Sequence, residues 1–129
     1  MAGELVLIVE DNDRNLELVQ DILELRGFRT ITAMSAALGI DLARQHVPDL
    51  VLMDIQLPDC DGVEALRQLR ADEVTHAIPV VALTAFAMTS DRTRFLDAGF
   101  DGYIAKPIDV RVLPDLVRQY IRHSDGAPA

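Results

Sequence analysis

The sequence has few of the residues that mark disulfide-bonded, zinc-binding or nucleic-acid-binding proteins. It contains a single cysteine, Cys60, and no tryptophan. One cysteine excludes an internal disulfide and a cysteine-based zinc site. The 12 lysines and arginines are outnumbered by 21 aspartates and glutamates, which gives a net charge of −9. We therefore expect no direct binding of nucleic acid, because no excess of basic residues is available to neutralise phosphates.

Long apolar runs are also missing. The longest apolar segments have only the length of a strand, and residues 1–4 carry no basic cluster of the kind that opens a signal peptide. We expect a cytoplasmic protein with no membrane association. Half of the 129 residues are nonetheless apolar, which is enough to fill the core of one globular domain. We place that domain at residues 1–123 and expect a frayed tail at 124–129.

The segment from Asp49 to Gly62 organises the rest of the chain. Four apolar residues, 50–53, run without a polar break and then meet Asp54. This pattern is typical of a strand that is buried on both faces and opens into a loop at its carboxyl end. Ligands of open parallel α/β sheets bind beyond the carboxyl ends of the strands, so Asp54 stands where chemistry is expected. Taken alone, an acid at such a place more often only ends a strand or caps a helix.

Four further segments have the composition of strands, at residues 5–9, 28–33, 78–83 and 102–105. Segments with the helical spacing of apolar residues separate the strands and follow the last one. Five strands that alternate with five helices predict a parallel sheet with helices on both faces, in the flavodoxin-like order 2-1-3-4-5. Segment 28–33 alternates more and is less apolar, as expected of an edge strand.

Local signals predict where two of these helices begin. Asp13 or Asn15 has the side chain to cap the helix after the first strand, and Ser35 has the side chain to cap the next helix. The spacing of apolar residues in that second helix turns Leu38 toward the core.

The predicted strand ends carry a set of polar residues with complementary chemistry. Glu10 and Asp11 follow the first strand, Asp54 the third, Thr84 the fourth and Lys106 the fifth. Carboxylates that share one crevice repel each other, so such a site needs cations. Lys106 supplies one positive charge, and carboxylates with room for water suit Mg²⁺ as the other. A carboxylate beside Mg²⁺ and a lysine can accept a phosphoryl group as an aspartyl phosphate.

With these residues in place, the chain resembles the receiver domains of two-component response regulators over residues 5 to about 122. The resemblance rests on four blocks in order: 10–12 (Glu-Asp-Asn), 54–62 (Asp-Ile-Gln-Leu-Pro-Asp-Cys-Asp-Gly), 83–85 (Leu-Thr-Ala) and 106–107 (Lys-Pro). The first block and residues 84–88 are most similar to stand-alone DivK-type regulators and to the receivers of hybrid histidine kinases. The resemblance implies a cytoplasmic signalling protein, not an enzyme in the usual sense, with a histidine kinase or histidine phosphotransfer protein and a downstream protein target as partners.

The resemblance also assigns roles. It implies that Asp54 is the phosphoacceptor and that Asp11 and Asp54 are metal ligands, with Glu10 acting through water and Gln56 through its backbone carbonyl. Thr84 and Lys106 would hold the phosphoryl group.

The same resemblance makes Tyr103 a switch residue that moves with Thr84, although Tyr103 can also be read as an aromatic plug at the sheet edge. The residues two beyond the phosphoacceptor and two beyond the threonine, Gln56 and Phe86, are placed to admit or exclude the water that hydrolyses an aspartyl phosphate. Phe86 can equally point away and belong to a partner surface. The three scattered histidines, 46, 76 and 123, are expected to be surface residues.

Some positions depart from the family pattern. Leu57 and Cys60 replace methionines that are frequent in that loop, which changes packing but not the chemistry. Pro114 would remove a backbone hydrogen bond if the last helix began at Asp109. Either the regular helix begins near Leu113, or its first turn is distorted.

Alternatives to a stand-alone phosphorylated receiver remain open from the sequence. A haloacid dehalogenase-type phosphatase also uses an aspartate at a strand end, but it needs a second aspartate two residues on, where this chain has Gln56. A receiver-like protein that binds partners without phosphorylation is a second alternative. The intact set of site residues speaks against it: Glu10, Asp11, Asp54, Thr84 and Lys106. A receiver excised from a hybrid histidine kinase is a third.

Overall fold

The structure, a computed structural model, describes residues 3–85 and 89–124. One sheet of five parallel strands has the order β2-β1-β3-β4-β5, as predicted. Its strands are β1 (Leu5–Val9), β2 (Arg29–Ala33), β3 (Leu50–Asp54), β4 (Val80–Thr84) and β5 (Gly102–Ala105). The helices are α1 (Asp13–Leu25), α2 (Ala36–His46), α3 (Gly62–Arg70), α4 (Thr89–Ala98) and α5 (Leu113–Ser124).

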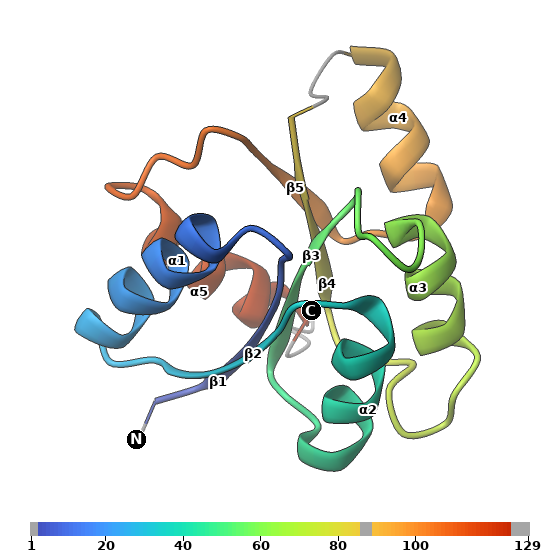
Figure 1. Cartoon of the computed structure of the whole chain (residues 1–129), viewed down its shortest axis with the longest axis horizontal. Helices are drawn as coiled ribbons and strands as arrows, with labels where there is room; N and C mark the ends of the chain where they lie inside the picture. The colour runs from blue at the N-terminus through green and yellow to red at the C-terminus, as the bar shows by residue number, and fades with distance from the viewer. Residues whose placement is uncertain (1–2, 86–88, 125–129) are drawn as a thin grey trace.

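The helices cover both faces of the sheet, with α1 and α5 on one side and α2, α3 and α4 on the other (Figure 1). Alternate residues of each strand point to opposite faces, which divides the core in two. Val6 and Ile8 of β1 pack in the cluster that includes α1 and α5 residues. Leu7 and Val9 pack in the cluster that includes residues of α2, α3 and α4. The continuous apolar runs of the central strands are therefore explained by burial on both faces.

The strand register brings the carboxyl ends of the central strands level with one another. Val9 pairs with Met53 across β1 and β3, and Asp54 pairs with Leu83 across β3 and β4. Glu10, the residue after Val9, therefore lies beside Asp54. Thr84 pairs with Ala105, which places Lys106 at the same edge of the sheet.

The helix starts differ from the sequence prediction at one cap. Asn12 caps α1, because its side-chain oxygen accepts a hydrogen bond from the Asn15 N–H at 3.0 Å. Asp13 is instead the first helical residue. Ser35 caps α2 as predicted, through a hydrogen bond from Leu38 N–H. The Leu38 side chain, however, is 47% exposed, so the prediction that it faces the core is wrong; Ala36, Gly39 and Ala43 are the buried residues of α2.

Pro114 and Gly102 explain where α5 begins and how α5 packs against β5. Pro114 is the second residue of α5, where its missing N–H would lack an intrahelical partner in any case. The regular helix thus begins at Leu113, which settles the two possibilities left by the sequence. Gly102 in β5 leaves room for the ring of Tyr120 from α5, which would overlap a Cβ at that position. Tyr120 therefore covers the start of the edge strand β5.

Candidate functional site

A cleft of about 360 Å³ opens at the carboxyl edge of the sheet. It lies between the loops that follow β1, β3, β4 and β5, where a doubly wound sheet binds its ligands. All the acids predicted for the site line it, together with Gln56, Thr84 and Lys106. Asn12 and Asn15 also line the cleft. The sequence did not predict that they lie in the same cleft as Asp54.

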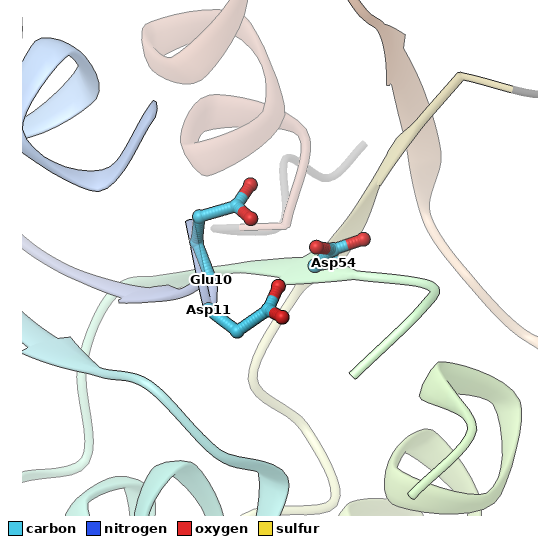
Figure 2. A group of neighbouring side chains, drawn as sticks. All are labelled: Glu10, Asp11 and Asp54. Atoms are coloured by element: carbon cyan, nitrogen blue, oxygen red, sulfur yellow. The ribbon is translucent and has the colours of Figure 1, made fainter. Parts of the chain in front are cut away.

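Three carboxylates meet in this cleft. Glu10 and Asp11 come from the end of β1 and Asp54 from the end of β3, and Figure 2 shows their carboxylates gathered around one space. One oxygen from each side chain lies within 4.8 Å of the others. Glu10 and Asp54 are only 1% and 5% exposed, whereas Asp11 is open to solvent. Such proximity of partly buried negative charges is unfavourable without a compensating cation.

Lys106 provides part of that compensation. Its Nζ lies 2.9 Å from Oε1 of Glu10 and 3.2 Å from Oδ2 of Asp54. The ammonium is thus shared by two carboxylates. The peptide bond between Lys106 and Pro107 is cis.

The pKa values of Glu10 and Lys106 reflect the crowding of charge in the cleft. Burial raises the pKa of Glu10, and the adjacent Asp54 carboxylate raises it further, against the opposing contacts from Lys106 and the Asn12 N–H. Burial alone would lower the pKa of Lys106, but the contacts with Glu10 and Asp54 together raise it. Lys106 is therefore held in its charged form, while the carboxylates still carry an excess of negative charge.

Asp54 is held in place from its own loop. Its Oδ1 accepts a hydrogen bond from the Gln56 N–H at 3.0 Å. The loop closes tightly behind it, because the Gly62 N–H donates to the Ile55 carbonyl at 2.8 Å. A Cβ at Gly62 would lie 2.8 Å from the Asp54 carbonyl oxygen, so only glycine fits that close approach.

The remaining predicted residues occupy different places. Thr84 is buried at the end of β4 and lines the cleft, and the Gln56 side chain is exposed at its rim. Tyr103 lies outside the cleft, in a groove between β5 and α5 that Leu116 and Tyr120 also line. Phe86 lies outside the described residues. His46 and His76 are exposed, as expected.

The donor set fits a hard divalent cation. Every candidate ligand is an oxygen atom, and three of them are carboxylates, the ligands that Mg²⁺ prefers. The three carboxylates face a single ammonium, whose Nζ lies 2.9 Å from Oε1 of Glu10 and 3.2 Å from Oδ2 of Asp54, so the set calls for a further cation.

A doubly wound α/β sheet with an acidic, lysine-containing cleft at its switch point defines the class of CheY-like signalling domains. Within that class the chain belongs to the response regulator receiver domain family, whose sequence model matches residues 6–118. Membership of this family argues against the alternative of a haloacid dehalogenase-type phosphatase. Among the described residues, no helix is long and apolar enough to cross a bilayer.

Individual relatives support the same assignment. The chain is 46% identical over 116 residues to the polar-differentiation response regulator DivK of Brucella ovis, covering 90% of this chain and 94% of that protein. It is 35% identical, with a TM-score of 0.85, to the receiver domain of a sensor histidine kinase from Pseudomonas aeruginosa PAO1, covering 93% and 98% of the two chains. That structure has a magnesium ion coordinated in its active-site cleft. A CheY-like receiver from Methanospirillum hungatei JF-1 is 28% identical, with a TM-score of 0.85 over 95% of this chain and 97% of its own.

Proposed function

We propose that the protein is a single-domain response regulator that accepts one phosphoryl group on Asp54. The proposal rests on Asp54 itself, which is nearly buried, oriented by the Gln56 N–H and paired with Lys106 inside an oxygen-rich cation site. The 46% identity to DivK across 94% of that protein favours a single-domain regulator over a receiver excised from a hybrid kinase. We place the receiver domain at residues 1–123; α5 extends one residue further, to Ser124, and residues 125–129 lie outside the described residues.

The reaction is a transfer from a phosphohistidine. A carboxylate oxygen of Asp54 attacks the phosphorus, and an O–P bond forms while the N–P bond breaks and its electron pair stays on the histidine nitrogen. Lys106 already contacts Asp54 and neutralises charge on the phosphoryl oxygens. The Thr84 hydroxyl donates a hydrogen bond to the product.

Asp11 and Asp54 would hold the metal directly, Glu10 through water and Gln56 through its backbone carbonyl. Mg²⁺ bound there would supply electrostatic stabilisation of the transferring oxygens. The cluster of three carboxylates around one space supports this assignment.

The donor is a histidine kinase or a histidine phosphotransfer protein, and the signal passes to a downstream protein target. The net charge of −9 favours partners with basic contact surfaces. Phosphorylation adds roughly −1.5 to −2 charge and strong hydrogen-bond acceptors, which draw the Thr84 hydroxyl toward the phosphoryl group. Tyr103 then moves into the space that Thr84 leaves, and the surface of β5 and α5 changes between two packings.

The lifetime of the phosphorylated state depends on water access at Gln56 and Phe86. Gln56 lies at the cleft rim, where its amide can hydrogen-bond the attacking water. Our hypothesis is that the apolar Phe86 slows hydrolysis of the aspartyl phosphate, so Phe86→Glu should shorten the lifetime relative to wild type. Equal decay rates of the aspartyl phosphate in wild type and Phe86→Glu would show that Phe86 does not control the lifetime. The decay rate of Gln56→Ala tests the other position in the same way.

Phosphorylation itself is tested by intact mass after incubation with acetyl phosphate and Mg²⁺. Wild type should gain one phosphoryl mass, Asp54→Asn none, and Asp97→Asn, which changes an exposed acid of α4, should behave as wild type. Full labelling of Asp54→Asn would refute the assignment of the acceptor. No labelling of wild type would favour a receiver that binds partners without phosphorylation.

A further inference from the structure

An acidic residue outside the cleft joins two elements that carry parts of the site. Asp59 lies in the loop between β3 and α3, five residues after Asp54. Its two carboxylate oxygens accept hydrogen bonds from the first backbone N–H groups of α2, Ala36 to Oδ1 at 2.9 Å and Ala37 to Oδ2 at 3.1 Å. These bonds cross 23 and 22 residues of sequence, so they connect the two loops directly.

These two hydrogen bonds, which we call the Asp59 clamp, complete the start of α2. The first N–H groups of a helix have no intrahelical partner, and here each of the first three has one. Asp59 takes those of Ala36 and Ala37, and the Ser35 hydroxyl takes that of Leu38 at 3.2 Å. A negative charge at this end is also favoured by the helix dipole. Both oxygens of Asp59 are therefore committed to α2, and these bonds lower its pKa.

The same clamp completes a ring of contacts around the cation site. The Glu10 N–H donates to the Ala33 carbonyl at 3.0 Å, which ties the end of β1 to the segment that opens α2. Asp59 ties the start of α2 to the β3–α3 loop. That loop is anchored at its base by the bridge between Gln56 and Asp61. The two halves of the acidic site, one from β1 and one from β3, are thus linked a second time outside the sheet.

We infer that Asp59 is a positioning residue, which holds the β3–α3 loop so that the Gln56 carbonyl and the Asp54 carboxylate face the acids of β1 in the arrangement that binds a divalent cation. The inference rests on the proposed Mg²⁺ site. Asp59 reaches neither the metal nor the phosphoryl group and acts only through the loop. Without the clamp, the loop gains conformational freedom that metal binding must remove again, so the cation binds more weakly.

The test is the Mg²⁺ dissociation constant, measured by isothermal titration calorimetry without any phosphodonor. Asp59→Ala should weaken Mg²⁺ binding by about 10-fold, within the range found when outer contacts of metal ligands are removed. Asp59→Asn keeps one acceptor oxygen and should weaken binding less than Asp59→Ala does. If Asp59→Ala does not fold, Asp59→Asn decides the question.

Two controls separate the clamp from simpler causes. Ser35→Ala removes the other cap of α2 but leaves both Asp59 bonds, so it should lower thermal stability without changing Mg²⁺ affinity. Asp41→Asn removes one negative charge from the exposed surface of α2 and reports the general electrostatic effect. A loss of affinity in Ser35→Ala or Asp41→Asn equal to that in Asp59→Ala would overturn the inference.

Amide hydrogen exchange gives a second readout. Coupling between two sites is reciprocal, so Mg²⁺ should slow exchange of the Ala36 and Ala37 amides in wild type and not in Asp59→Ala. If Mg²⁺ binds wild type and Asp59→Ala equally well, the inference is wrong while the proposed metal site stands. If wild type binds no Mg²⁺, the proposed metal site is wrong, and the inference about Asp59 is wrong with it.

Discussion

The charge balance of the acidic cleft predicts that removing the Asp54 carboxylate stabilises the metal-free protein. With an effective dielectric constant of about 20, two carboxylates 4.8 Å apart repel by about 3.5 kcal/mol. Glu10 repels Asp54 by this amount or more, and Asp11 by less, because Asp11 is exposed and screened. The contact with Lys106 at 3.2 Å offsets about 5 kcal/mol. Allowing for screening, a net repulsion of about 1–2 kcal/mol remains at Asp54.

We therefore expect Asp54→Asn to raise the free energy of unfolding by about 1–2 kcal/mol in EDTA at pH 8, or the melting temperature by about 5 °C. The asparagine amide can keep the Gln56 hydrogen bond through its oxygen. Mg²⁺ at ten times its dissociation constant should stabilise wild type by about 1.4 kcal/mol and the variant hardly at all. Differential scanning calorimetry with and without Mg²⁺ measures both effects.

The pH dependence has a definite sign. Burial, and then the Asp54 carboxylate, raise the pKa of Glu10 in the folded protein, so metal-free wild type loses stability as pH rises through that folded pKa. Protonation of Glu10 at lower pH removes its repulsion of Asp54. The gain from Asp54→Asn should consequently be smaller at pH 5 than at pH 8.

A matched control is Asp21→Asn, which makes the same change on the exposed face of α1 and should leave stability within about 0.5 kcal/mol. The reasoning would be refuted by a lower melting temperature of Asp54→Asn than of wild type in EDTA. Equal stabilisation of both proteins by Mg²⁺ would refute the placement of the metal.

Three further predictions concern residues away from the cleft. Gly102→Ala should cost about 2 kcal/mol because its methyl group overlaps the Tyr120 ring, and a double-mutant cycle with Tyr120→Ala in denaturant should show strong coupling; additive effects would contradict the overlap. Arg70→Ala removes hydrogen bonds to three backbone carbonyls and one carboxylate and should lower the free energy of unfolding by about 2–4 kcal/mol. Arg70→Lys should recover less than half of that loss. No measurable loss in Arg70→Ala would show that water can replace the guanidinium contacts. The Asp59 carboxyl, whose pKa the α2 amides lower, should titrate by NMR below the usual range of about 3.9, and its contribution to α2 is present above that usual value and lost as pH falls through the lowered pKa. A midpoint at or above the usual value would mean that the clamp does not persist in solution.

Much of the architecture was predictable because its signals are local. Unbroken apolar runs such as 50–53 mark strands buried on both faces, and the polarity of parallel strands sends every carboxyl end to one edge. Glu10, Asp54 and Lys106 could therefore be placed together before any coordinates were known, and the structure confirms that they meet. Helix details were less accessible. Asn12 caps α1 in place of Asp13 or Asn15, since several adjacent residues could make that bond.

The amino-acid sequence by itself determined which segments form strands and helices and which polar residues end the strands, because these follow from hydrophobic period and chain direction. The sheet order 2-1-3-4-5 was the expected choice, and the strand pairing of the tertiary structure established it. Only the tertiary structure decided how Lys106 divides its charge between Glu10 and Asp54, and that Leu38 stays exposed on α2. It also decided that Asp59 binds the start of α2. Such contacts join residues far apart in the chain, so their geometry depends on how whole elements pack, and no local pattern of residues contains that information.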